Sequence, residues 1–220
     1  MAIAFFDLDR TLLAGNSATA WLLFDWRAGR LRLGELVEGV YWLIRYQLGA
    51  AKLEQALHQA IATINGLTEQ ELVTRVEQFY QKAIRGRFRP GGLAALAAHR
   101  EKGDTLVLLT SGVSYIAERV QRDLKLDDRL STHLELDADG KFTGRPVEPL
   151  CFGPGKIAHA SRYAEQAGVL MSTCTFYTDS ASDLPMLELV GHPVAVNPDP
   201  RLRRIALRRR WTVVDWGEPI

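Results

Sequence analysis

The chain begins with the stretch AIAFFDLDRTLLAGNS, residues 2–17, in which an apolar run ends at two aspartates separated by one leucine. Residues 2–6 are apolar at every position, which predicts a strand buried on both faces of a parallel sheet. Asp7 and Asp9 follow where this strand leaves the core, and their spacing directs both carboxylates to one side. Two neighbouring anions repel each other unless a cation or a shared proton relieves them. The stretch therefore predicts a metal ion beside the first strand.

Length and composition indicate a folded protein with a sizeable core. The chain has 220 residues, of which 47% are hydrophobic, enough for one large domain or for a core with a smaller insert. A formal net charge of +1 argues against a generally basic protein, and we expect no nucleic-acid partner. The two cysteines, Cys151 and Cys174, are far apart and lack metal-ligand spacing, which favours a reducing cytoplasm over a structural disulfide.

The apolar segments do not have the pattern of membrane or export signals. The first apolar run has no charged region before it and is interrupted early by Asp7, unlike a signal peptide. The most apolar later segment, residues 37–50, contains Glu38 and Arg45 and falls short of the ~18 uncharged residues of a spanning helix. We therefore expect a cytoplasmic protein without stable membrane association, in which this segment is an amphipathic helix rather than a membrane-surface anchor.

A long helical region is predicted after the first strand. Residues 17–85 have helical apolar spacing, and the segments 17–29, 34–49 and 51–66 each end close to a glycine. Thr68 and Glu71 have the spacing of a capping box, which predicts the start of a helix that runs to about residue 84. The residues 89–92, RPGG, then predict a break. Because this region contains no strand of its own, we expect it to form an inserted helical lid.

Helices and strands alternate in the rest of the chain. A hairpin is predicted over residues 132–145, with Asp139 and Gly140 near its turn. The other predicted elements are helices at 92–103, 114–126, 155–168 and 200–210, and strands at 105–109, 173–180, 193–197 and 211–216. This alternation predicts an α/β fold, a doubly wound (Rossmann-like) parallel sheet with an inserted all-helical cap. The predicted boundaries are residues 1–14 and 88–220 for the core and 15–87 for the cap.

Ligands of open parallel sheets bind beyond the carboxyl ends of the strands, and four polar segments fall at or near such ends. They are Asp7-Leu8-Asp9-Arg10-Thr11, Thr110-Ser111-Gly112, Lys156, and Asp179 with Asp183. In this order and spacing they resemble the four motifs of the haloacid dehalogenase superfamily. The DxDxT form implies the phosphatase branch of that superfamily. The helical insert directly after the first motif resembles the cap of its phosphoserine-phosphatase-like group.

The resemblance implies a role for each acidic residue of the first and last motifs. Asp7 is expected to attack phosphorus and to form an aspartyl-phosphate. Asp9 is expected to protonate the leaving alkoxide and then to deprotonate the attacking water, while the Thr11 hydroxyl helps to fix Asp9. Asp179 supplies a further oxygen ligand, and the carboxylate of Asp7 and the backbone carbonyl of Asp9 complete a set that Mg²⁺ prefers.

Phosphoryl transfer spreads negative charge over the phosphate oxygens, so hydrogen-bond donors must surround them. The Thr110 hydroxyl and the amides of Ser111 and Gly112 suit this role, because they are expected to open a helix whose N-terminus favours anions. A strand that ends at Leu109 favours Thr110 over Ser111 as the phosphate-binding hydroxyl, but both stay open. Lys156 is expected to neutralise the nucleophile and the bound phosphate.

Several residues near the motifs allow two interpretations. Asp183 either holds Lys156 or a metal-bound water, or caps the helix that follows it. Arg10 is either a surface side chain or a group that reaches the phosphate or closes against the lid. The lid should select the substrate, although core packing and solvation also explain its aromatic and basic residues. The candidates are Asn16, Ser17, Trp21, Phe24, Arg45, Arg85, Arg87 and Arg89.

The segment PRLRRIALRRR, residues 200–210, contains six arginines. A patch for nucleic acid or anionic membrane is one interpretation of this charge. Leu202, Ile205 and Leu207 instead fit an apolar face that docks on the sheet and leaves the arginines in solvent, and we favour this interpretation.

The motifs together predict a Mg²⁺-dependent phosphatase that hydrolyses a small phosphorylated metabolite through an aspartyl-phosphate, as a monomer or homodimer. A phosphotransferase and a lipid or nucleotide phosphatase are alternatives with the same chemistry. A non-catalytic regulator that binds phosphate esters is disfavoured, because binding alone needs neither a nucleophile nor a general acid. Dehalogenation is disfavoured because it requires neither the Asp9 acid nor a metal.

Overall fold

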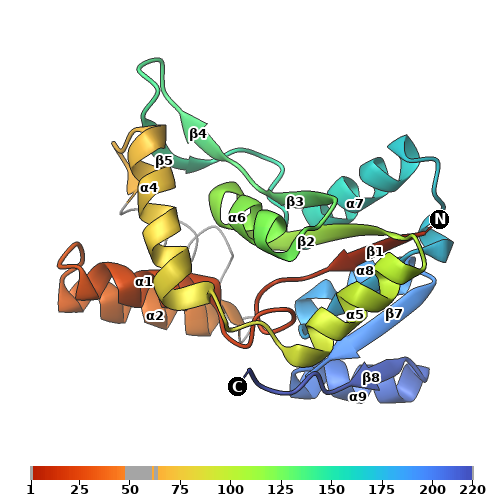
Figure 1. The fold of residues 1–220 in the computed structure, drawn as a ribbon. Coiled ribbons are helices and arrows are strands. Elements are labelled where there is room, and N and C mark those ends of the chain that lie inside the picture. The colour runs from red at the N-terminus through yellow and green to blue at the C-terminus, as the bar shows by residue number, and fades with distance from the viewer. Residues whose placement is uncertain (1, 48–60, 62–63, 220) are drawn as a thin grey trace.

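The structure is a computed structural model and describes residues 2–47, 61 and 64–219. Within these residues, six parallel strands form a central sheet in the order β3-β2-β1-β6-β7-β8 (Figure 1). The strands are β1 Ile3–Phe6, β2 Thr105–Val113, β3 Asp128–Thr132, β6 Thr175–Thr178, β7 His192–Val196 and β8 Thr212–Val214. Because β1 pairs with β2 on one side and with β6 on the other, the strand order reverses at the centre of the sheet. This topology confirms the predicted doubly wound α/β fold.

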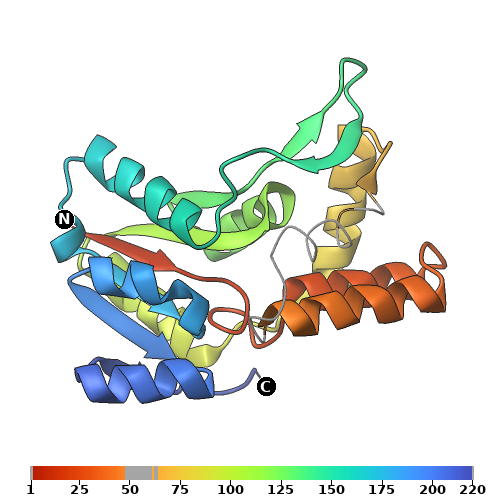
Figure 2. The same ribbon diagram turned by 180° about the vertical axis from the view of Figure 1, so that it is seen from behind.

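Helices cover both faces of the sheet (Figures 1 and 2). On one face lie α5 (Pro90–Glu101) and α6 (Ser114–Leu124), and on the other α7 (Pro154–Gln166), α8 (Leu184–Leu189) and α9 (Pro200–Arg209). Ala4 and Phe6 of β1 enter the first hydrophobic cluster, whereas Ile3 and Phe5 enter the second. The uniformly apolar sequence of β1 therefore follows from burial on both faces.

A separate group of helices lies beyond the carboxyl end of β1 (Figure 1). The group consists of α1 (Ser17–Arg27), α2 (Leu33–Gln47), α4 (Glu69–Phe79) and the short π-helix η2 (Tyr80–Ile84). The two segments that connect it to the sheet run side by side, with Ala14 N donating to Arg87 O across 2.9 Å. The capping box predicted for α4 is confirmed, since Thr68 and Glu71 exchange hydrogen bonds. The helix predicted at residues 51–66 lies largely outside the described residues.

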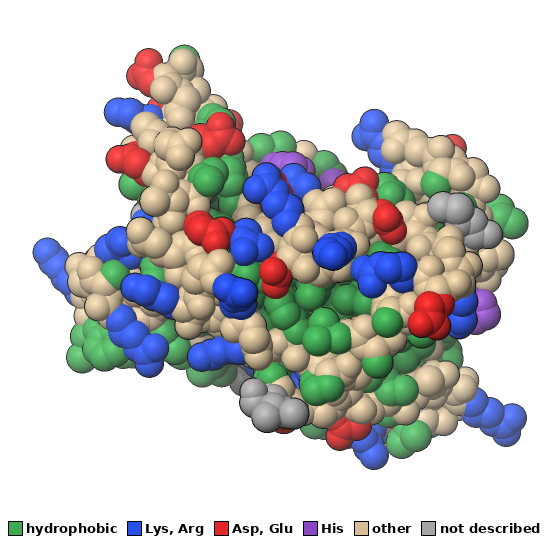
Figure 3. All heavy atoms as spheres, in the orientation of Figure 1, with side chains coloured by type: hydrophobic (Ala, Val, Ile, Leu, Met, Phe, Trp, Pro, Cys, Tyr) green, Lys and Arg blue, Asp and Glu red, His purple; other side chains and the backbone are tan. Residues whose placement is uncertain are grey.

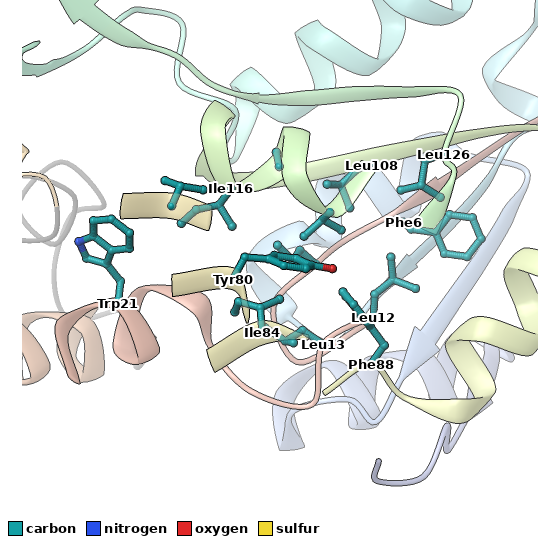
Figure 4. Close-up of a cluster of buried hydrophobic side chains, with 14 of the residues drawn as sticks. Phe6, Leu12, Leu13, Trp21, Tyr80, Ile84, Phe88, Leu108, Ile116 and Leu126 are labelled. Atoms are coloured by element: carbon teal, nitrogen blue, oxygen red, sulfur yellow. The ribbon is translucent and has the colours of Figure 1, made fainter. Parts of the chain in front are cut away.

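This helical group shares a hydrophobic core with the sheet (Figure 4). One buried cluster extends from Phe6 and Leu108 in the sheet to Tyr80 of η2 and Trp21 of α1. The Trp21 side chain is 4% exposed and packs edge-on against Phe79, with ring centroids 5.1 Å apart. Of the two interpretations of Trp21 from sequence, core packing is the one that the structure supports.

Three local details differ from the sequence predictions. β2 continues past Leu109, because Val113 pairs with Thr132 of β3 after an irregularity in the register. β3 was not predicted, since its sequence DRLST is largely polar and it lies at the edge of the sheet. The predicted break lies before Pro90, between η2 and α5, and not at residues 89–92, because proline is accepted in the first turn of a helix. The hairpin is confirmed: β4 (Leu134–Leu136) pairs antiparallel with β5 (Phe142–Pro146).

The surface of α4 and α6 carries charges of both signs close together (Figure 3). Arg119 Nε of α6 donates to Glu77 Oε2 of α4 across 2.7 Å and so connects the helical group to the layer on the sheet. The arginines of α9 are exposed, as predicted. α9 is anchored by Leu202 and Ala206, whereas Leu207 is 60% exposed, which corrects the predicted apolar face. No helix among the described residues is long and apolar enough to cross a membrane.

Candidate active site

Asp7 is the first residue after β1, and contacts hold both oxygens of its buried carboxylate. Its backbone N–H donates to Tyr177 O of β6 across 3.0 Å, which extends the pairing of β1 by one residue. Lys156 Nζ donates to Asp7 Oδ1 across 2.8 Å, and Thr11 Oγ1 lies 3.5 Å from Asp7 Oδ2. Burial raises the pKa of Asp7 to about 7, although the positive charge of Lys156 acts to lower it.

Lys156, near the start of α7, joins Asp7 to the last motif. Its Nζ also donates to Asp183 Oδ2 across 2.8 Å, and Thr178 Oγ1 donates to the same oxygen across 2.7 Å. Burial acts to lower the pKa of Lys156, but Asp183 and Asp7 outweigh it and raise the pKa above its usual value. The ammonium is therefore charged between two carboxylates. Of the two interpretations of Asp183, contact with Lys156 is the one that the geometry supports.

Asp179 follows β6 and lies across the Thr11 hydroxyl from Asp7. Thr11 Oγ1 accepts a hydrogen bond from Asp179 N across 3.0 Å and lies 3.4 Å from Asp179 Oδ1. Thr11 thus connects Asp7 and Asp179 and does not fix Asp9, which corrects the sequence prediction. Burial, together with the negative charge of Asp7, raises the pKa of Asp179 to about 8.

The donor set around Asp7 and Asp179 fits a hard divalent cation. Asp7 and Asp179 are each 7% exposed as whole residues, and the nearby charge of Lys156 is shared with Asp183. Among the described residues, no group of three or more His, Cys, Asp or Glu side chains forms a ready metal cluster. A cation here would therefore take two carboxylates and complete its shell with backbone oxygen and water, a mixture that suits Mg²⁺.

The carboxylate of Asp9 is held by Ser17, the first residue of α1. Ser17 N donates to Asp9 Oδ1 across 2.7 Å, and Ser17 Oγ donates to Asp9 Oδ2 across 3.1 Å. Burial raises the pKa of Asp9, and the two hydrogen bonds from Ser17 oppose this shift. Sequence patterns indicate Ser17 only as a contact of the leaving group and do not reveal its contact with Asp9. The sequence feature that could have indicated this contact is a serine at the start of the first helix, eight residues after Asp9.

The second motif belongs to β2 and not to a helix. α6 begins at Ser114, so Thr110, Ser111 and Gly112 precede its first turn, contrary to the prediction. Thr110 Oγ1 accepts a hydrogen bond from Gly112 N across 3.1 Å, and the Thr110 side chain is buried while Ser111 is half-buried. The choice between the two hydroxyls as the phosphate-binding group stays a prediction.

Arg10 turns the loop after β1, with a φ of 59° that glycine adopts most easily. Its side chain is exposed. Burial raises the pKa of Asp179 and of Asp9, whereas the positive charge of Arg10 acts to lower both pKa values. Arg10 therefore lies near the two carboxylates. This position is compatible with either interpretation of Arg10 from sequence.

The predicted arginine candidates of the lid are dispersed. Arg89 is 6% exposed, donates to the carbonyls of Arg10 and Gly217 and pairs with Glu218, so it ties the loop after β1 to the C-terminal segment. Arg45 stacks over Tyr41 and Trp42 of its own helix. Arg85 and Arg87 are exposed near the end of η2.

Comparison with known proteins gives the family of the chain. Residues 4–188 match the family model of haloacid dehalogenase-like hydrolases, and the chain belongs to this family. Phosphoserine phosphatase SerB1 of Mycobacterium tuberculosis (strain ATCC 25618 / H37Rv) is 35% identical over 227 residues, which cover 98% of this chain and 71% of the relative. Histidinol-phosphatase of Neisseria meningitidis serogroup C (strain 8013) is 28% identical over 97% of this chain and 98% of the relative. The chain is therefore an enzyme, a phosphatase of the haloacid dehalogenase type.

Solved structures share the fold over nearly the whole chain. A protein from Bordetella pertussis Tohama I has a TM-score of 0.87 at 30% identity, with 98% of this chain and 99% of that chain covered. A phosphoserine phosphatase solved as an analogue of its phospho-aspartyl intermediate has a TM-score of 0.74 at 18% identity, covering 99% and 94%. At that identity the second likeness shows the fold alone.

Proposed function

We propose that this enzyme hydrolyses phosphate monoesters of small soluble metabolites through an aspartyl-phosphate at Asp7, with Mg²⁺ as cofactor. The observation that carries the proposal is the buried Lys156 ammonium, 2.8 Å from both Asp7 Oδ1 and Asp183 Oδ2. A charged lysine beside a carboxylate offsets the repulsion between that carboxylate and an approaching phosphate. Nucleophilic attack on the phosphate requires this compensation, whereas a carboxylate that is only buried does not.

In the first step an oxygen of Asp7 attacks phosphorus, and the bond from phosphorus to the ester oxygen breaks. The Asp9 carboxyl gives its proton to that oxygen, so the leaving group departs as an alcohol. In the second step a water attacks phosphorus and gives a proton to the Asp9 carboxylate. The bond from phosphorus to Asp7 then breaks, which releases inorganic phosphate and returns both aspartates to their first state.

The remaining motif residues are assigned to binding and orientation. Lys156, Arg10 and the donors of Thr110, Ser111 and Gly112 would surround the phosphate oxygens, and Asp183 would hold Lys156 in place. The Asp7 and Asp179 carboxylates, with the Asp9 backbone carbonyl, would hold Mg²⁺. The cation would offset negative charge on the phosphoryl group.

In this proposal, residues 15–87 form the lid of the enzyme, and residues 1–14 and 88–220 form its catalytic core. The position of α1, α2 and α4 beyond the carboxyl end of β1 supports this division, because ligands of parallel sheets bind at that end (Figure 1). The lid would select the leaving group, since the core residues contact only phosphate and metal.

Phosphate release from a panel of phosphorylated metabolites, with Mg²⁺, tests the proposal. Phosphoserine and histidinol phosphate head the panel, because relatives carry the names of these activities. The Asp7→Asn protein, run beside the wild type, should fold and bind a phosphate analogue but lose at least ~10³-fold in turnover, as expected for a lost nucleophile. Equal activity of both proteins, or no release from any ester by folded wild type, would contradict the proposal.

A further inference from the structure

The proposed general acid, Asp9, takes its hydrogen bonds from the helical group and not from the sheet. Both donors of Ser17 go to it, the backbone N–H to Oδ1 across 2.7 Å and the hydroxyl to Oδ2 across 3.1 Å. Ser17 itself is 3% exposed. Because one residue binds both oxygens, the plane of the carboxyl group is set by the position of that residue.

The start of α1 leaves Ser17 available for this contact. Asn16 is the N-cap residue, and its Oδ1 accepts hydrogen bonds from Thr19 N across 2.9 Å and from Thr19 Oγ1 across 3.1 Å. The Ser17 hydroxyl is therefore not needed to cap the helix. Its N–H is one of the first amides of the helix, which have no partner inside the helix, and it donates to Asp9 instead.

α1 is packed into the helical group, so Ser17 cannot move alone. Trp21, one turn further along α1, is buried against Phe79 of α4. A hydrogen bond weakens steeply once its geometry departs from the normal range. A shift of α1 by about one ångström would therefore release at least one oxygen of Asp9.

We propose that Ser17 is a positioning residue for Asp9 and that proton transfer to the leaving group depends on α1 being in place. This inference rests on the proposed function, because it presumes that Asp9 is the acid. It assigns the lid a second task besides substrate selection, namely the orientation of the acid at the moment of bond cleavage.

The test compares two leaving groups in the first turnover. Nitrophenolate is a stable anion near neutral pH and needs no proton, whereas a primary alkoxide does. Ser17→Ala should slow release of the alcohol by about tenfold, part of the ~10²- to 10⁴-fold that general acid–base catalysis supplies. Release of nitrophenolate from nitrophenyl phosphate should change by less than about twofold, and KM for both esters should stay nearly constant.

Two variants control for a general loss of structure. Thr19→Ala removes a hydroxyl of the same helical turn that does not contact Asp9 and should leave both rates unchanged. Ser17→Thr keeps the hydroxyl and should restore alcohol release. Equal slowing of both leaving groups by Ser17→Ala, or no slowing of either, would overturn the inference.

A second measurement separates this inference from the proposed function. If the wild type releases neither leaving group, the proposed function fails, and a crystal structure of Ser17→Ala decides the remaining point. An Asp9 carboxyl that turns away from its wild-type position supports a positioning role for Ser17. An unmoved carboxyl overturns that role.

Discussion

Lys156 and Asp7 are 149 residues apart in the chain, yet the ammonium of one lies 2.8 Å from the carboxylate of the other, with both side chains buried. The same ammonium contacts Asp183 across 2.8 Å. Removal of the lysine would therefore leave two buried carboxylates without their shared cation. If the proposed function holds, stability and catalysis would depend on the same contact.

Replacement of Lys156 tests this dependence. Lys156→Met should lower the free energy of unfolding by about 3–5 kcal/mol, the usual cost of leaving a buried charge without its partner. It should also lower kcat/KM at least ~10²-fold, since a fixed charge at the reacting phosphate is lost. Urea unfolding and phosphate release measure the two effects, with the exposed Lys102→Met as control. An unchanged free energy of unfolding would contradict the buried contact.

The metal requirement is tested by removing the cation and then one of its proposed ligands. EDTA should abolish turnover, and excess Mg²⁺ should restore it, because the proposed cation would offset the negative charge of the phosphoryl group beside Asp7 and Asp179. Asp179→Asn should raise the Mg²⁺ concentration for half-maximal activity at least about tenfold, as even residues outside the ligand shell change metal affinity by this much. Glu101→Gln, an exposed acid at the end of α5, should have no effect. Turnover that survives chelation would exclude the proposed ligand set.

The fold could be predicted from sequence because its pattern is strong in the central strands. β1 is apolar at each position, and this property follows directly from burial on both faces of the sheet. β3 escaped prediction because an edge strand is covered less and tolerates polar residues such as Asp128 and Arg129. The extension of β2 escaped prediction for the same reason, since its last residue pairs with β3.

The candidate site could be predicted as a set of residues but not as a set of contacts. Parallel topology brings the ends of β1 and β6 together, so Asp7 and Asp179 had to be neighbours. The partners of Thr11 and Ser17 depend on how the loop after β1 bends, and Arg10 sets this bend with a φ that sequence patterns do not reveal for arginine. Thr178 was missed because its hydroxyl acts on Asp183 through tertiary structure alone.

Gly155 is predicted to be required for the placement of Lys156. A Cβ atom at this position would lie 1.8 Å from the Leu150 carbonyl oxygen, so the start of α7 would have to shift. Gly155→Ala should lower the free energy of unfolding by about 1–3 kcal/mol, the range for overpacking, and should reduce turnover as Lys156 moves. Gly34→Ala is the control: no atom lies within 4 Å of its Cβ, and alanine favours the helix by about 0.5–1 kcal/mol. Equal unfolding free energies of the two variants would contradict the close approach.

The ion pair between Asp25 and Arg75 is predicted to hold α1 and α4 together. Arg75 Nε donates to Asp25 Oδ1 across 3.0 Å, its Nη2 pairs with Oδ2, and its guanidinium lies 4.9 Å from the centroid of the Trp21 ring. Arg75→Met should lower the free energy of unfolding by about 3 kcal/mol, the low end for a broken buried pair, because Arg30 lies 3.4 Å from Asp25 and still offsets part of its charge.

The double variant Asp25→Leu/Arg75→Met decides whether the stability lost in Arg75→Met comes from the Asp25 carboxylate that is left without its partner. Without that carboxylate, two apolar side chains of similar size can pack together, so the double variant should regain most of the lost stability. Urea unfolding of the wild type, both single variants and the double variant gives the coupling free energy directly. A double variant as unstable as the sum of the two single variants would mean that Asp25 and Arg75 act independently, and that α1 is held to α4 by the packing of Trp21 on Phe79 instead.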